Sequence, residues 1–178
     1  MADNFLKEPE YYMHLALAQA HLALEHGEIP VGCVIVDEAG RIVGQGCNMT
    51  ISASDPTAHA EVMALRNAGE RLKNYRLPEL SLYVTLEPCC MCSGAIIHAR
   101  IKNVYFGAAD PKTGACGSVF NVLNDMRHNH HPNIVGGILQ EECADILRSF
   151  FKMRRKMHKE GRDWLKERGR SRDWLEKK

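Results

Sequence analysis

The sequence has 178 residues, the size of one domain with at most a short appendage, which excludes a repeat array or a multidomain protein. Its 45% hydrophobic and 25% charged residues are ordinary for a globular protein, and the formal net charge is only +1. That value hides a division: residues 1–151 hold 11 Lys and Arg against 17 Asp and Glu (net −6), whereas residues 152–178 hold 12 against 5 (net +7). A basic end on an acidic body indicates contact with nucleic acid or a membrane, and charge alone does not distinguish them.

The first half of the sequence predicts two helices and a hairpin. Apolar residues at helical spacing, with a proline at the start and a glycine after the end, predict a helix over residues 9–26. Two short apolar runs, residues 31–36 and 41–46, flank a turn and predict a β-hairpin. After a polar loop, a second helix is expected over about 58–72, with Thr57 as its N-cap.

The second half predicts a parallel crossover unit followed by shorter elements. Residues 81–86 are typical of a buried strand, 90–100 of a helix and 104–107 of a strand, and this order connects two parallel strands. After a polar loop, residues 119–124 are compatible with a short helix and 134–139 with a fifth strand.

A last helix is expected from about residue 140 into the basic end, with apolar residues on the face that packs against the sheet. For Phe151, as for Phe150, a place in the core is favoured over contact with a ligand. The expected fold class is therefore α/β, with three layers (α/β/α) and a mixed central sheet of about five strands.

The beginning of the chain and its cysteines indicate a reduced compartment. Residues 1–8 have neither the positive start nor the apolar stretch of a secretion signal, and no segment approaches the roughly 18 apolar residues of a membrane span. The seven cysteines are odd in number, and Cys89, Cys90 and Cys92 fall within four positions, which disfavours a disulfide framework. We therefore expect a cytoplasmic protein with no membrane partner, in which cysteines bind a metal.

Two pairs of residues are the candidates for metal binding and catalysis, and each pair lies at the start of a predicted helix. Cys89 and Cys92 are three positions apart, so their sulfurs face the same way on one turn, and a helix N-terminus favours thiolates. With His59 as third ligand, such a set favours zinc. Glu61 reaches the same point as His59 only within the first helical turn. Cys90 points elsewhere and is expected to be a packed or partly exposed thiol.

Three ligands leave the fourth position of a tetrahedral zinc open, which is typical of a catalytic site. Zinc lowers the pKa of a bound water to about 7, and a carboxylate in the place of Glu61 can carry the proton to a leaving group. Two alternatives are two buried thiols that bind nothing, and a closed structural zinc with a fourth ligand from another cysteine or His98. The absence of a paired spacing for such a ligand disfavours the closed site.

The pattern His59-x-Glu61 with Pro88-Cys89-x-x-Cys92 resembles the zinc-dependent nucleoside and nucleobase deaminases. Further segments between about Tyr12 and Met157 resemble the bacterial tRNA-specific adenosine deaminase family; they include residues 55–61, 85–89, 91–98, 106–108 and 112–115. The resemblance implies a cytidine-deaminase-like fold, a Zn²⁺ cofactor, a homodimer and conversion of adenosine to inosine at the tRNA wobble position. A deaminase of free guanine, cytosine or cytidine is the alternative enzyme, and a zinc-stabilised RNA-binding module is the non-enzymatic alternative.

The same resemblance implies roles for single residues. His59, Cys89 and Cys92 would bind zinc, and Glu61 would be the proton shuttle. Asn48 would hold the base, although an asparagine that caps a turn is the commoner case.

Other substrate contacts are expected around the pocket. Ile29 and Pro30 would line it, unless they form only the entry of the hairpin core. Asp110, in the loop after the fourth strand, would accept a hydrogen bond from a ribose 2′-hydroxyl.

The basic end divides the chain into an expected deaminase domain, residues 1–157, and a basic helical extension, residues 158–178. Arg154 and Arg155 match the last helix of the family and are expected beside the anticodon stem-loop of a bound tRNA, with a solvated face as the alternative. For the extension, three interpretations stand in falling order: an exposed helix, a phosphate contact and an amphipathic helix on a membrane surface.

Overall fold

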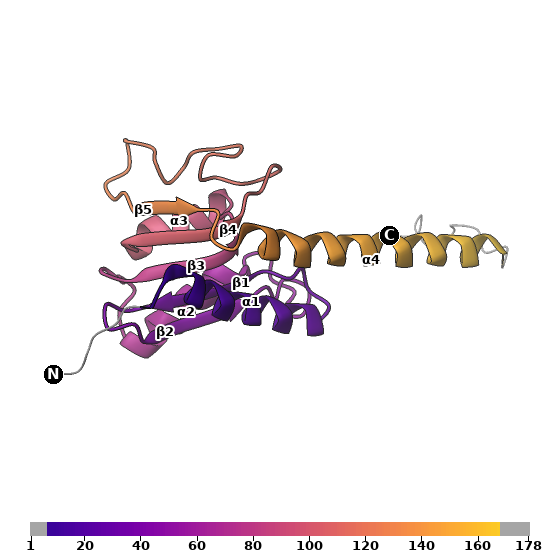
Figure 1. The fold of residues 1–178 in the computed structure, drawn as a ribbon, viewed down its shortest axis with the longest axis horizontal. Helices are drawn as coiled ribbons and strands as arrows, with labels where there is room; N and C mark the ends of the chain where they lie inside the picture. Colours follow the sequence, from indigo (N-terminus) through magenta and orange to yellow (C-terminus); the bar gives the residue numbers. More distant parts are fainter. Residues whose placement is uncertain (1–6, 168–178) are drawn as a thin grey trace.

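The structure is a computed structural model that describes residues 7–167, with side chains described as far as Gly161. Helices and strands are interspersed along the chain, as in a mixed α/β protein (Figure 1). In order they are α1 (Pro9–Glu25), β1 (Gly32–Val36), β2 (Ile42–Cys47), α2 (Ala60–Leu72), β3 (Ser81–Leu86), α3 (Cys90–Ala99), β4 (Asn103–Ala108), β5 (Asn133–Gly136) and α4 (Gln140–Glu167).

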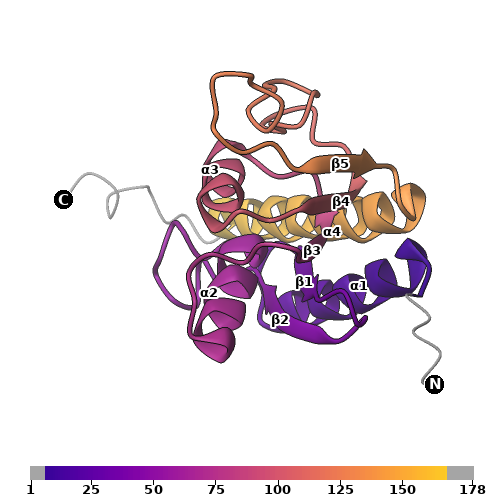
Figure 2. The ribbon, with the colours of Figure 1, turned by 90° about the vertical axis from the view of Figure 1, so that its left-hand side faces the viewer.

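The strands form one mixed sheet in the order β2-β1-β3-β4-β5. β1 is antiparallel to both β2 and β3, whereas β4 is parallel to both β3 and β5. Figure 2 shows α1 and α4 on one face of this sheet and α2 and α3 on the other. The expected three layers, five strands and parallel crossover from β3 through α3 to β4 are therefore confirmed.

The core lies on both faces of the sheet because its central strands are buried on both sides. Along β1, Cys33 and Ile35 pack with the α2 side, while Val34 and Val36 pack with the α1 side. A strand buried on both faces has a continuous apolar sequence, which is why the run 31–36 shows no alternation.

Glycines in β2 allow α2 to approach the sheet closely. A Cβ atom added at Gly46 would lie 2.6 Å from the backbone nitrogen of Ala64 and 2.7 Å from the carbonyl oxygen of Ala60. Only glycine leaves room for that contact. The contact holds the first turn of α2, which carries Glu61, against the sheet.

Two of the expected elements differ in the structure. Residues 119–124 form irregular loop structure, with an isolated bridge between Asn121 and Cys116, instead of a helix. The backbone N–H groups of Val119 and Phe120 donate to the carbonyl of Gly114. The last strand ends at Gly136, short of the expected 139, because Gly137 has a positive φ of 88° that ends the extended backbone.

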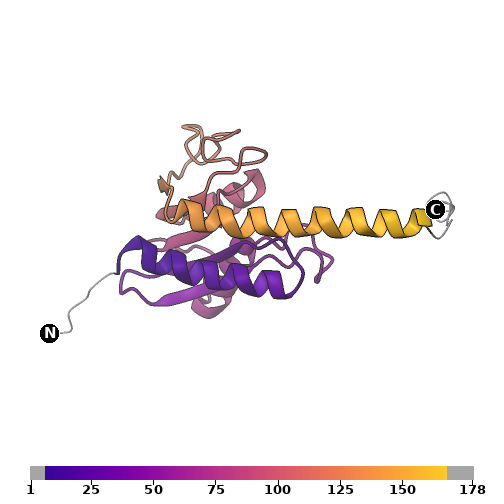
Figure 3. The ribbon, with the colours of Figure 1, turned by 45° about the vertical axis from the view of Figure 1, so that its right-hand side comes forward.

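α4 is one uninterrupted helix that passes the proposed boundary between residues 157 and 158 and projects well beyond the sheet (Figures 1 and 3). Phe150 is 5% exposed and belongs to the core, but Phe151 is 42% exposed, so its expected place in the core is wrong. Neighbouring residues on a helix point about 100° apart, so only one of the two can face the sheet. Over the described part of the chain, no helix is long and apolar enough to span a membrane.

Candidate active site

The predicted site residues collect at one edge of the sheet. The start of β1 and the ends of β2, β3 and β4 meet there, with Gly32 opposite Cys47, Cys33 opposite Val84 and Leu86 opposite Ala108. Ile29 precedes β1, Asn48 follows β2 and Asp110 follows β4. Loops at the carboxyl ends of neighbouring strands converge, which explains how residues far apart in sequence share one place.

The N-termini of α2 and α3 bring the three expected metal ligands together. His59 is the N-cap residue of α2, Cys89 is the N-cap residue of α3 and Cys92 lies in its first turn. The Nδ1 atom of His59 lies 3.7 Å from the Sγ of Cys89 and 3.5 Å from the Sγ of Cys92.

These separations fit one tetrahedral zinc ion. Bond lengths of about 2.0–2.3 Å and tetrahedral angles place neighbouring ligand atoms about 3.4–3.8 Å apart. Among the described residues, the ligand atoms within 4.8 Å of one another come only from His59, Cys89 and Cys92. His98 lines a different hollow, so the arrangement favours an open site over a closed structural one.

The ionisation of the ligands also favours a cation. The hydrogen bond from Cys92 lowers the pKa of Cys89 to about 4, with a further contribution from His59, and outweighs the effect of burial. The pKa of Cys92 is raised because that thiol donates to Cys89 and is buried. At neutral pH the pair therefore already contains a thiolate, the form that binds a metal.

Glu61 lies in the first turn of α2 and is only 4% exposed. Burial raises the pKa of its carboxyl to about 7, and the negative charge of Cys89 acts in the same direction. A carboxyl group in this range can both accept and release a proton at neutral pH. Glu61 and His59 line the same cavity, as the first-turn argument requires.

Asn48 connects β2 to the first turn of α2. Its Oδ1 atom accepts a hydrogen bond of 2.9 Å from the backbone N–H of Ala60, one of the donors that a helix start leaves free. The prediction of Thr57 as the N-cap of α2 is wrong. Thr57 lies two residues before the cap position, and its hydroxyl donates to Asp55. Asn48 thus supplies part of the cap from 12 positions away in sequence.

A cavity of about 840 Å³ opens above these residues, between the edge of the sheet and α4. Of the expected substrate contacts, Ile29, Asn48, Asp110 and Arg155 line it. Pro30 is buried and does not contribute to the lining. The described lining also omits Arg154, whose guanidinium lies 5.9 Å from the centre of the Phe150 ring.

Cys90, expected to be a packed or partly exposed thiol, is exposed. The α4 wall contributes residues that sequence reasoning had not placed at the site, namely Leu147, Arg148, Phe151 and Lys152.

Sequence reasoning also missed two buried carboxylates that hold the loops around the cavity. Glu28 accepts hydrogen bonds from the N–H of Ser52 (2.7 Å) and from the N–H of Ile51 (2.9 Å). Burial alone would raise the pKa of Glu28, but these bonds and those from neighbouring hydroxyls lower it overall.

Glu87 does the same for the loop after β4. It accepts from the N–H groups of Asp110 (2.9 Å), Cys116 (2.8 Å) and Ser118 (3.1 Å), and from the Ser118 hydroxyl. These donors outweigh burial and lower the pKa of Glu87. No local sequence pattern predicts that Glu28 and Glu87 hold these loops, because the partners of both residues lie more than 20 positions away in the sequence.

Comparison with known proteins gives the same site and fold. A family model described as the cytidine and deoxycytidylate deaminase zinc-binding region matches residues 6–108, which include the three candidate ligands and Glu61. The tRNA-specific adenosine deaminase of Haemophilus influenzae is 53% identical over 150 residues, which cover 84% of this chain and 87% of that protein.

Solved structures extend the likeness to three dimensions. A structure from a study of A-to-I editing by tRNA:A34 deaminases has a TM-score of 0.74 and 44% identity, and the match covers 77% of this chain and 99% of that one. Guanine deaminase from Nitrosomonas europaea has a TM-score of 0.73 over 82% of this chain and 85% of its own, but at 21% identity this likeness concerns the fold alone.

Proposed function

Since this chain belongs to the cytidine and deoxycytidylate deaminase family, we propose that it converts adenosine to inosine at the anticodon wobble position of tRNA. The observation that carries the proposal is the group of His59, Cys89 and Cys92 beside the buried Glu61, at the floor of a cavity large enough for a nucleobase. The substrate class follows from the relatives that share the whole domain, which are named tRNA-specific adenosine deaminases.

The reaction replaces the 6-amino group of adenine with oxygen from water and releases ammonia. His59, Cys89 and Cys92 hold the zinc, which when bound supplies the Lewis acid that activates water for attack. Glu61 transfers the two protons of the water, one to N1 of the purine ring and one to the departing amino group, so that the carboxylate is restored at the end of each turnover.

The other lining residues bind and orient the nucleotide. The Oδ1 of Asn48 is held by the backbone of Ala60, which fixes the amide plane and directs its Nδ2 donor to the base. Asp110 sits at the cavity and receives the proposed hydrogen bond from a ribose 2′-hydroxyl. Its carboxylate also accepts from the hydroxyl of Thr113, which orients it.

RNA is favoured over a free nucleobase by the α4 wall. Arg148, Lys152 and Arg155 line the cavity, and the half-exposed ring of Phe151 lies among them. Cationic groups beside an exposed aromatic ring are what a looped-out nucleotide with its phosphates requires, whereas a free base carries no phosphate.

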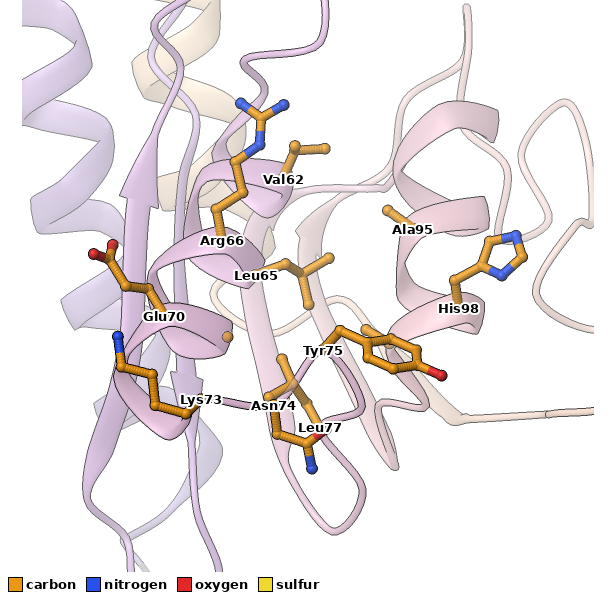
Figure 4. A pocket seen from close by; sticks show the side chains of 12 residues that line it. Val62, Leu65, Arg66, Glu70, Lys73, Asn74, Tyr75, Leu77, Ala95 and His98 are labelled. Carbon is orange, nitrogen blue, oxygen red and sulfur yellow. The ribbon is translucent and has the colours of Figure 1, made fainter.

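We also propose that the protein acts in the cytoplasm as a homodimer. A second hollow of about 580 Å³ lies between α2, α3 and the loop that joins α2 to β3, away from the active-site edge (Figure 4). Leu65, Leu77 and the 71% exposed Tyr75 give this hollow an apolar lining, and it is the surface that we propose for the contact between the two copies. Sedimentation velocity of the purified chain tests this, and Tyr75→Glu is expected to shift a dimer towards monomer.

The function is tested with an anticodon stem-loop that carries a wobble adenosine, with free guanine and cytosine in parallel. We expect inosine and equimolar ammonia from the RNA alone, and a rate at least about 10²-fold lower with Glu61→Gln. Deamination of guanine or cytosine without inosine in RNA would establish the alternative enzyme. If the unaltered chain and Glu61→Gln bind the RNA equally tightly and neither forms product, the protein is the RNA-binding module.

A further inference from the structure

Glu87 holds a loop that forms part of the cavity wall. This loop, residues 110–118, follows β4, and we name it the β4 loop. The carboxylate of Glu87 is buried, and both of its oxygens accept hydrogen bonds from the β4 loop. Oε2 accepts from the N–H of Asp110 and the hydroxyl of Ser118, and Oε1 accepts from the N–H groups of Cys116 and Ser118. The two ends of the loop are therefore bound to one charged group.

The middle of the β4 loop is packed just as closely. An isolated β-bridge joins Gly114 to Cys89, one of the candidate metal ligands. A Cβ atom added at Gly114 would lie 2.5 Å from the carbonyl oxygen of Asp110 and closer still to Oε2 of Glu87. The loop thus fits around the carboxylate with no space for a larger residue at this position.

Asp110 is the residue of the β4 loop that Glu87 orients most directly. Its backbone N–H donates to Glu87 at 2.9 Å. Its side chain accepts from the N–H of Lys112 (2.9 Å) and from the hydroxyl of Thr113 (2.7 Å). Asp110, Lys112 and Thr113 all line the cavity. The backbone of Asp110 is therefore fixed from the interior and its carboxylate is fixed at the cavity.

We propose that Glu87 is a positioning residue that sets the preference for ribose over deoxyribose, and that it acts through Asp110. This inference rests on the proposed function, in which Asp110 accepts a hydrogen bond from the 2′-hydroxyl of the wobble adenosine. The oxygens of Glu87 are already bound by the loop, so the residue serves the substrate by holding Asp110. An acceptor that is fixed in advance loses little freedom when the hydroxyl arrives, so its hydrogen bond contributes more to binding.

The Glu87→Gln variant should release Asp110 and little else. If the NH₂ group of the glutamine takes the place of Oε1, it meets the N–H groups of both Cys116 and Ser118. In the place of Oε2 it meets only one N–H, that of Asp110, because the hydroxyl of Ser118 can rotate to accept. The second orientation loses fewer hydrogen bonds, and it leaves the N–H of Asp110 facing a donor.

The experiment compares two RNA hairpins that differ by one oxygen atom. Both carry the same anticodon loop, with either adenosine or 2′-deoxyadenosine at the wobble position. The values of kcat and KM for inosine formation are measured on each hairpin, and zinc content is measured for every variant.

Two control variants separate this role from a general supporting one. Ser118→Ala removes the hydroxyl bond to the same carboxylate and keeps the acceptor of the Asp110 N–H. Glu28→Gln neutralises the other buried carboxylate, which holds a loop outside the proposed ribose contact.

For the unaltered chain, a hydrogen bond to a charged acceptor predicts a kcat/KM about ten- to a hundredfold higher on the ribose hairpin. Glu87→Gln should retain its zinc and lower this preference at least about threefold, through a higher KM on the ribose hairpin, because a contact kept throughout the reaction acts on KM. Ser118→Ala and Glu28→Gln should change the preference less than about twofold.

A double variant tests the route. In a chain that carries Asp110→Asn, Glu87→Gln should have no further effect on the ribose preference, because the residue through which it acts is already altered. If Glu87→Gln does not fold, Gly114→Ala takes its place, since the added Cβ forces the loop away from an unchanged carboxylate and should cause the same loss.

An unchanged ribose preference in Glu87→Gln, or an equal fall of kcat on both hairpins, would overturn the proposal and leave Glu87 a supporting role only. So would an equal loss of preference in Glu28→Gln, additive effects with Asp110→Asn, or an unaltered chain that shows no ribose preference. In each of these results the unaltered chain still forms inosine. Failure of the proposed function is a different result, because the unaltered chain would then form inosine in neither hairpin.

Discussion

Glu28 is predicted to support the active site through the loop that follows Asn48. Its side chain is 0% exposed, and its carboxylate accepts from the N–H groups of Ile51 and Ser52 and from the hydroxyls of Thr50 and Ser52. Glu28→Gln keeps the shape and one carbonyl oxygen but removes the charge.

The magnitude follows from the two short backbone bonds, at 2.7 and 2.9 Å. A hydrogen bond to a charged group contributes about 1.5–3 kcal/mol and a neutral one about 0.5–1.5, so neutralising the acceptor of both bonds costs about 2 kcal/mol. Glu28→Ala leaves both N–H groups without an acceptor and is expected to cost about 3–5 kcal/mol.

The stability that Glu28→Gln loses relative to the native chain decreases as the pH falls. Hydrogen bonds lower the pKa of Glu28 below its ordinary value of 4.5, so its ionised form stabilises the fold above that pH. The stability difference between the native chain and Glu28→Gln should therefore be full at pH 7 and shrink as the pH falls below 4.5.

Urea unfolding at pH 7 and at a series of lower pH values measures this difference, and deamination of the RNA hairpin measures its functional consequence. Thr50→Val, which removes one hydroxyl bond of 3.2 Å, is the control and should cost less than half as much. The reasoning fails if Glu28→Gln is as stable as the native chain at pH 7, or if the difference grows on acidification.

Four further outcomes are expected. Glu61→Gln should retain one zinc per chain by elemental analysis and lower kcat at least about 10²-fold, and loss of the zinc instead would show a structural role. A strong chelator should abolish activity and lower Tm, and added Zn²⁺ should restore both; a metal-free chain with full activity would contradict the zinc site. Gly46→Ala should destabilise the fold by about 1–3 kcal/mol in urea, whereas Gly94→Ala, which meets open space, should stabilise it by up to about 1 kcal/mol. Asp110→Asn should lower activity on the RNA hairpin more than on a matched DNA hairpin, and an unchanged ratio would remove the 2′-hydroxyl contact.

The part of the site that could be predicted is the part determined by local spacing. Cys89 and Cys92 lie on one helical turn, and His59 and Glu61 share another first turn, so their chemistry follows from the sequence and helix geometry. The alternation of apolar runs and helical patterns likewise determined the mixed sheet. These features need no knowledge of partners far away in the chain.

The features that could not be predicted depend on distant partners. The N–H of Ala60 is bound by Asn48 after β2 and not by the nearby Thr57, and Glu28 binds a loop 23 positions away. Local rules for helix caps choose among residues just before the helix, so they name a nearby threonine when the tertiary fold supplies an asparagine. Residues 119–124 do not form the expected helix for the same reason, since the hydrogen bonds of the loop around Glu87 and Gly114 determine their backbone conformation.

The division of charge along the chain has a clearer meaning once burial is known. Glu28, Glu61 and Glu87 are all buried, so three carboxylates of the acidic part add little to the exposed charge around the cavity mouth. The exposed wall of the same cavity carries Arg155 and Lys152. A polyanion repelled by the body as a whole therefore meets local positive charge along α4, and its association should slow as salt screens that contact. The sign of the charge at the cavity rim, and not the near-zero total, determines which ligands reach the site.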